Sequence, residues 1–159
     1  PVWADATTKT DLLARFGYVF QTPEGSSYPP ILDMNNITGP FTITGAGGEI
    51  DFQPFEVAHG NTKALGFRVG DMAYLPDVSD IPDAAWVHLK NLKLWIVDAL
   101  RYDPHPSHTH VEKTLDWIAR VKPEWAIITN MHVDLDYATL QSELPAAVEP
   151  AFDMLTHSI

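Results

Sequence analysis

The second half of the chain alternates short apolar runs with amphipathic stretches. Leu94–Val97 and Trp125–Ile128 are continuously apolar, a pattern typical of strands that are buried on both faces. Between them, Val111–Val121 carries apolar residues on one helical face, which predicts an amphipathic helix with Ser107 or Thr109 as its cap. Three shorter elements are predicted around this core: a helix over 83–92, a helix over 137–143 and a closing strand over 148–153. Strands that alternate with helices indicate an α/β fold.

The first half predicts one strand and one helix, followed by antiparallel strands. A strand is expected over 2–4, and a helix over 7–16 that is capped by Asp5 or Thr7 and ended by Gly17. Alternating apolar and polar positions then predict strands over 41–44, 50–55, 64–69 and 72–75. Because no repeat and no shift of composition marks a boundary, we expect a single domain over 1–159.

Composition limits the class of protein. The 159 residues are 45% hydrophobic, enough for a domain with a core, and no apolar run approaches the roughly 20 residues of a membrane span. We expect a soluble protein with no membrane partner and, since no stretch resembles a signal peptide, a cytoplasmic one. The chain has no cysteine, so any metal must be held by imidazole and carboxylate groups. The net charge of −11 argues against a nucleic-acid partner.

Acidic residues and histidines stand where the predicted strands end. His59, Asp77 and Asp98 each close or follow an apolar strand. His132 comes shortly after another such strand, and His108 lies in the proline-rich loop before the long helix. Because α/β enzymes gather their functional side chains at strand ends, these residues predict a common site.

Five short motifs follow one another in order along nearly the whole chain. They are His59-Gly60, Tyr74-Leu75-Pro76-Asp77, Asp98-Ala99-Leu100-Arg101, His105-Pro106-Ser107-His108 and Thr129-Asn130-Met131-His132-Val133-Asp134-Leu135-Asp136-Tyr137. This ordered set resembles the metallo-β-lactamase-fold phosphodiesterases. It is most similar to the branch of phosphoribosyl 1,2-cyclic phosphate phosphodiesterase, and more distantly to the tRNA 3′-processing endonucleases. The resemblance implies an α/β/β/α sandwich with its site at the sheet edge.

One motif of that family is missing. Its members carry a His-x-His-x-Asp-His metal motif in their first half, and this chain has no such string. The segment His108–Lys113 has Glu and Lys where Asp and His are required. We therefore expect the chain to be the C-terminal part of the domain, with an incomplete metal site, poor metal affinity and little activity alone.

The resemblance also implies roles for individual residues. The intact domain is expected to hold two divalent metal ions, zinc or manganese, with Asp77 as a bridging ligand and His59 as a terminal one. Many relatives carry a further metal histidine at the position of Asn130. Residues two apart on an extended strand point to the same side, so His132 is expected to be this ligand and Asn130 to line the site. His108 is expected to be the catalytic acid or to position the phosphate, and with Asp77 it forms the catalytic pair.

Other roles follow less directly. From the residues alone, Asp77 also suits a turn and His59 a half-buried structural position. Asp98 is expected to orient a metal-binding histidine from behind. Arg101 is expected either to contact phosphate or to pair with Asp98 or Asp103.

The main hypothesis is a metal-dependent phosphodiester hydrolase that acts on a small cyclic or nucleotide-like phosphate through a metal-activated hydroxide. The alternative is a non-catalytic fragment or assembly module that retains the fold without a complete metal site and works as a homodimer. A β-lactam or thioester hydrolase of the same superfamily fits less well, because the loop around His108 resembles the phosphodiesterase branch.

Overall fold

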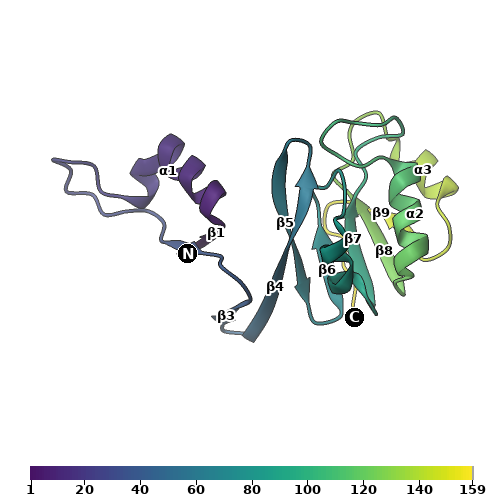
Figure 1. Ribbon diagram of the computed structural model, residues 1–159, viewed down its shortest axis with the longest axis horizontal. Helices are drawn as coiled ribbons and strands as arrows, with labels where there is room; N and C mark the ends of the chain where they lie inside the picture. Colours follow the sequence, from purple (N-terminus) through teal and green to yellow (C-terminus); the bar gives the residue numbers. More distant parts are fainter. Residues whose placement is uncertain (159) are drawn as a thin grey trace. The chain divides into compact units, whose positions relative to one another are not determined.

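The computed structural model describes residues 1–158 and divides the chain into two compact units, Pro1–Phe41 and the residues from Thr42 onward (Figure 1). No helix within the described part is long and apolar enough to cross a membrane. The two units are best understood separately, because they differ in how much side chain they bury.

The first unit is a parallel strand pair joined by a helix. Strand β1 (Val2–Ala4) pairs with β2 (Met34–Asn36), and helix α1 (Ala6–Phe20) lies between them in the sequence. The Asp5 carboxylate caps α1 by accepting hydrogen bonds from the backbone N–H groups of Thr7 and Thr8, at 2.8 and 3.0 Å. Among residues 1–41 only Ala4 is buried, so this unit has almost no core of its own.

The second unit is built on a seven-stranded sheet in the order β3-β4-β5-β6-β7-β8-β9. Its strands are β3 Phe41–Gly45, β4 Gly48–His59, β5 Thr62–Val69, β6 Met72–Leu75, β7 Leu94–Asp98, β8 Trp125–Thr129 and β9 Val148–Pro150. Strands β4, β5 and β6 pair antiparallel, whereas β6, β7, β8 and β9 pair parallel. The carboxyl ends of β6, β7 and β8 therefore meet at one edge of the sheet, where α/β folds place their functional side chains.

Helices cover one face of this sheet (Figure 1). They are the 3₁₀ helix η1 (Asp83–Leu89), α2 (Val111–Val121) and α3 (Tyr137–Glu143). Leu89 of η1 and Trp117 of α2 pack with Trp95 of β7 in the main core, and Trp95 is fully buried. A helix layer on a mixed sheet is the arrangement expected of one half of an α/β/β/α sandwich.

Several predicted element boundaries are wrong. Strand β4 extends beyond the predicted 50–55 at both ends and β5 begins before residue 64, and three further boundaries differ for a local reason. Helix α1 continues past Gly17 to Phe20, with a kink at Phe16, because Gly17 keeps helical backbone angles. The helix predicted over 83–92 ends at Leu89, since Asn91 adopts a left-handed φ of 53°. The last strand stops at Pro150, because the backbone from Phe152 onward closes a turn.

The predicted cap of α2 is also wrong. The N-cap residue is His110, and its side chain makes no capping hydrogen bond. Thr109 is instead buried, with its Oγ1 3.1 Å from Oγ1 of Thr114. This threonine therefore serves the core beneath the site rather than the exposed end of the helix.

Candidate active site

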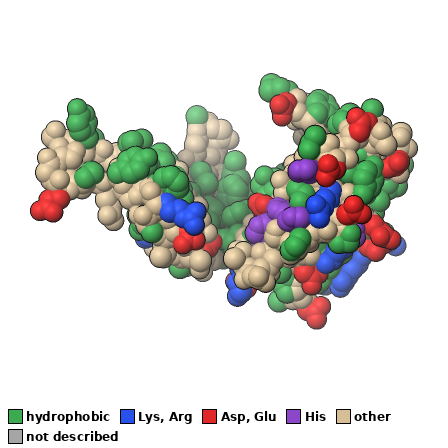
Figure 2. Space-filling model, turned by 90° about the horizontal axis from the view of Figure 1, so that it is seen from above, with side chains coloured by type: hydrophobic (Ala, Val, Ile, Leu, Met, Phe, Trp, Pro, Cys, Tyr) green, Lys and Arg blue, Asp and Glu red, His purple; other side chains and the backbone are tan. Residues whose placement is uncertain are grey.

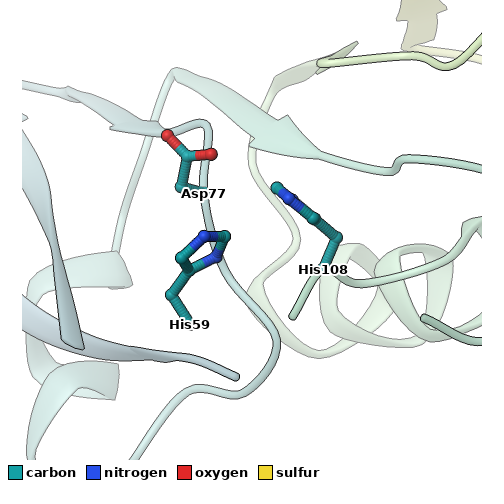
Figure 3. A group of neighbouring side chains, drawn as sticks. All are labelled: His59, Asp77 and His108. Carbon is teal, nitrogen blue, oxygen red and sulfur yellow. The ribbon is translucent and has the colours of Figure 1, made fainter. Parts of the chain in front are cut away.

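Three ligand-type side chains converge at the edge of the sheet of the second unit (Figure 3). His59 ends β4, Asp77 follows β6, and His108 lies in the loop before α2. Ligand atoms of the three side chains all lie within 4.8 Å of one another. The rings of His59 and His108 stand edge to face with centroids 4.6 Å apart, whereas the carboxylate of Asp77 is exposed.

Backbone hydrogen bonds place Asp77 beside His59. The loop after β6 runs back along the end of β4, where Ser79 N donates to Ala58 O at 2.8 Å and Ala58 N donates to Asp80 O at 3.0 Å. These bonds hold the loop next to the last residue of β4. Two residues that are 18 positions apart in the sequence are thereby brought to one site without a long side-chain reach.

The Asp98 carboxylate orients His108 from behind. Asp98 is fully buried at the end of β7, and its Oδ2 lies 2.8 Å from Nδ1 of His108 and accepts from Val78 N at 3.2 Å. Burial raises the pKa of Asp98, although the hydrogen bonds from His108 and Val78 act in the opposite direction. A proton on Nδ1 of His108 satisfies this carboxylate and leaves Nε2 to face a ligand or substrate. The expected role of Asp98 behind a metal-binding histidine stays a prediction.

The side-chain amide of Asn130 contacts Pro76, Asp98 and His108, which lie in three different segments of the site. It follows β8 in a left-handed conformation, with a φ of 60°. Its Nδ2 lies 3.2 Å from Pro76 O, 3.3 Å from Asp98 Oδ1 and 3.2 Å from His108 Nδ1. When His108 donates to Asp98, the two amide hydrogens of Asn130 serve Pro76 and Asp98. The amide therefore fastens the loop that carries Asp77 to the carboxylate that orients His108.

His132 does not join the converging group. The expectation that it points to the same side as Asn130 is wrong, because the left-handed backbone at Asn130 ends the extended strand. The His132 side chain is 51% exposed, and its Nδ1 lies 2.9 Å from Asp134 Oδ2. A metal-ligand role for His132 stays a prediction.

Arg101 braces the loop that leads to His108. The expected ion pair with Asp98 or Asp103 is replaced by bonds to the backbone, because the loop turns its carbonyl groups toward the guanidinium. Nε donates to Asp103 O at 3.1 Å and Nη2 donates to Pro104 O at 2.8 Å. These two bonds support a rigid loop, and a phosphate contact by Arg101 stays a prediction.

Two buried threonines support the site, a role that the sequence analysis assigned to neither. Oγ1 of Thr114 donates to the backbone carbonyl of Asp98 at 2.7 Å, and Thr109 N donates to Val78 O at 2.6 Å. Both threonine side chains are fully buried. The only signal available in the sequence is a threonine on the otherwise apolar face of the predicted helix over 111–121.

The converging side chains fit one divalent cation. Nδ1 of His59 is buried and has no hydrogen-bond partner in the described part of the chain, an arrangement that is rare unless a ligand completes it. Two imidazoles and one carboxylate are donors that zinc and manganese both accept. Catalytic zinc sites commonly use three protein ligands and leave a position open. His59, Asp77 and Nε2 of His108 would hold such an ion.

Comparisons with known proteins agree with this fold. Residues 1–131 match the family model described as "Beta-lactamase superfamily domain". A crystal structure of a new diphosphatase from the PhnP family is 29% identical, with a TM-score of 0.86, and the match covers 100% of this chain and 58% of that one. The curated octanoyltransferase of Porphyromonas gingivalis (strain ATCC BAA-308 / W83) is 29% identical over 97% of this chain and 31% of its own length. The chain thus spans only part of the length of both relatives.

Two more distant structures share the fold alone. They are Zn²⁺-bound PqqB from Methylobacterium extorquens, 10% identical, and the metallo-β-lactamase fold protein YhfI from Bacillus subtilis, 13% identical, each with a TM-score of 0.69. Their matches cover 99% and 95% of this chain, and 64% and 61% of theirs. The predicted α/β fold of the metallo-β-lactamase type is confirmed, and since the family model matches most of its length, the chain belongs to the beta-lactamase superfamily.

Proposed function

We propose that the chain is the C-terminal part of a metal-dependent phosphodiester hydrolase that acts on a small cyclic or nucleotide-like phosphate. The observation that carries this proposal is the convergence of His59, Asp77 and His108, with ligand atoms within 4.8 Å of one another. The likeness to a PhnP-family diphosphatase supports a substrate that contains phosphate. The name of the octanoyltransferase describes a protein of which this match covers 31%, so it supports no acyl transfer here.

Each residue of the group has a distinct task in this proposal. His59 and the exposed Asp77 bind the cation. When bound, a divalent cation lowers the pKa of water and draws charge from phosphate oxygens. His108, whose Nδ1–H is held by Asp98, presents Nε2 to the same cation, so that a ligand role takes the place of the acid role expected from the sequence. Asp98 keeps that ring in one tautomer and one orientation.

The site is proposed to be incomplete in this chain. The group of three converging ligands suits one ion, whereas the two-ion chemistry of the family needs more ligand side chains than these three. The diphosphatase match covers 58% of that structure, which leaves room for further ligands in the rest of such a domain. We therefore expect the 159-residue chain to bind a single zinc or manganese ion weakly and to turn over slowly.

Hydrolysis of bis-p-nitrophenyl phosphate tests the proposal. Slow hydrolysis is expected after zinc or manganese is added to the chain, with loss of the rate in a chelator. His59→Ala should abolish the metal-dependent rate, whereas His157→Ala, a substitution at a ring that stacks on Trp125 outside the converging group, should not change it. Hydrolysis that persists in the chelator, or that is equal in wild type and His59→Ala, contradicts the proposal.

The alternative function is a non-catalytic module that keeps the fold without the chemistry. It is favoured by the small size of the ligand group, since three converging side chains are too few for the two-ion site of the family. The two functions differ in what metal does to the chain. A module needs no bound metal, whereas the hydrolase must take up metal through His59 and Asp77.

A further inference from the structure

The loop before α2 carries a second imidazole next to His108. The rings of His105 and His108 have centroids 5.4 Å apart and are tilted by 44°. His105 is half-buried, so part of its ring stays accessible to a ligand. Figure 2 shows histidine side chains gathered on one face in the right-hand part of the view, the part that holds the second unit.

Hydrogen bonds fix which nitrogen of His105 carries the proton. Ser107 N lies 3.3 Å from Nδ1 of His105 and donates to it, and Ser107 Oγ lies 3.3 Å from the same nitrogen. A backbone N–H can only donate, so Nδ1 holds a lone pair and the proton of the neutral ring lies on Nε2.

The loop is held from two sides, so the position of His105 is fixed. Arg101 donates from Nε and Nη2 to the carbonyl oxygens of Asp103 and Pro104, the two residues before His105. On the other side, the turn after His59 packs against Ser107. A Cβ atom on Gly60 would lie 3.0 Å from Ser107 Cβ, and Gly60 has a φ of 60°. Only glycine is tolerated easily at such a contact.

We propose that His105 is a substrate-recognition residue whose Nε2–H donates to a phosphate oxygen of a substrate bound over His59, Asp77 and His108. This inference rests on the proposed function. Nε2 makes no hydrogen bond to any residue of the described chain, so its donor is unused. A cation held by His108 and the Nε2–H of His105 can contact two oxygens of one phosphate group, because the two rings are this close. The cation then draws charge from one oxygen, and His105 donates to another that keeps its bond to phosphorus.

Two substitutions separate recognition from loop support. In His105→Gln the amide nitrogen replaces the Nε2 donor and the acceptor for Ser107 is lost. In His105→Asn the amide oxygen replaces the Nδ1 acceptor and the Nε2 donor is lost. The probe is inorganic phosphate, titrated into the zinc-saturated 159-residue chain at constant ionic strength. Its affinity is measured from the shifts of the imidazole ¹⁵N resonances, with His157→Ala as the control variant.

The recognition role predicts a clear order of affinities. His105→Asn should weaken phosphate binding by about tenfold or more, the effect of losing one hydrogen bond to a charged group, and His105→Gln should stay within about threefold of wild type. Equal affinities in all variants, weaker binding in His105→Gln than in His105→Asn, or no phosphate binding by wild type overturn the inference. In each of these cases, zinc binding that depends on His59 would still support the proposed hydrolase. If neither phosphate binding nor zinc binding that depends on His59 is found, the proposed hydrolase is contradicted as well.

Discussion

The two sides of the candidate site differ in how firmly the structure holds them. On the side of β7 and α2, the Asp98 carboxylate is fully buried and bonded to His108, Val78 and Asn130. On the opposite side, the carboxylate of Asp77 is exposed. The buried, hydrogen-bonded Asp98 therefore fixes the geometry of the site, whereas the exposed carboxylate of Asp77 is accessible to a ligand.

Removing the buried carboxylate should have the largest effect. Asp98→Ala leaves the N–H groups of His108, Val78 and Asn130 without an acceptor, and we expect a loss of about 3 kcal/mol in the free energy of unfolding. Asp77→Ala is the matched control on the exposed side, and it should stay within about 0.5 kcal/mol of wild type. Urea unfolding followed by tryptophan fluorescence measures both. Equal losses in the two variants would mean that the two sides do not differ as described.

A smaller effect is expected from the buried hydroxyl beneath Asp98. Thr114→Val keeps the shape of the side chain but removes the hydroxyl that donates to Asp98 O and contacts Thr109. The expected loss is about 1 to 2 kcal/mol, since the buried carbonyl of Asp98 loses one donor. The same urea experiment applies, with Thr139→Val on the exposed start of α3 as the comparison. A Thr114→Val protein as stable as wild type contradicts a supporting role for this hydroxyl.

The raised pKa of Asp98 predicts the sign of a pH effect. Because burial raises the pKa of Asp98 above 3.8, the folded chain keeps this proton to higher pH than the unfolded chain. The contribution of Asp98 is therefore fully present below that value and is lost as pH rises through the folded pKa. As pH rises above 3.8, the stability of wild type relative to Asp98→Asn should therefore fall. A constant difference as pH rises is the contrary result.

The smallest effect is expected on the exposed rim. His132→Ala removes a half-exposed pair with Asp134, and the free energy of unfolding should change by less than about 0.5 kcal/mol. Because His132 lies outside the converging group, zinc affinity should change far less than in His59→Ala. Zinc titrations of the two variants, run side by side, measure this. Equal losses would restore His132 as a ligand.

The sequence predicts most of the elements, for reasons that are local. The helix Val111–Val121 and the short helix Tyr137–Glu143 begin and end where the pattern indicates, because helical spacing of apolar residues is a strong signal. The parallel strands Leu94–Asp98 and Trp125–Thr129 follow from continuous apolar runs. Element ends are less predictable, as the continuation of α1 through Gly17 shows.

The site is predictable only as far as strand ends indicate it. The position of His59 and Asp77 after strands predicts that they share an edge, and the structure brings them together with His108. The left-handed turn at Asn130 cannot be seen in the pattern, and it moves His132 away from the group. The bonds of Thr114 and Ser107 depend on tertiary packing, which the local sequence does not encode.

Calorimetric titration of zinc into the metal-free 159-residue chain tests the central claim most directly. The account predicts about one equivalent of weakly bound zinc, because His59, Asp77 and His108 provide the three protein ligands of an open site. It also predicts that His59→Ala and Asp77→Ala each abolish this binding, whereas His157→Ala leaves it unchanged. No zinc binding by wild type, or equal binding in wild type and the His59 and Asp77 variants, contradicts the account.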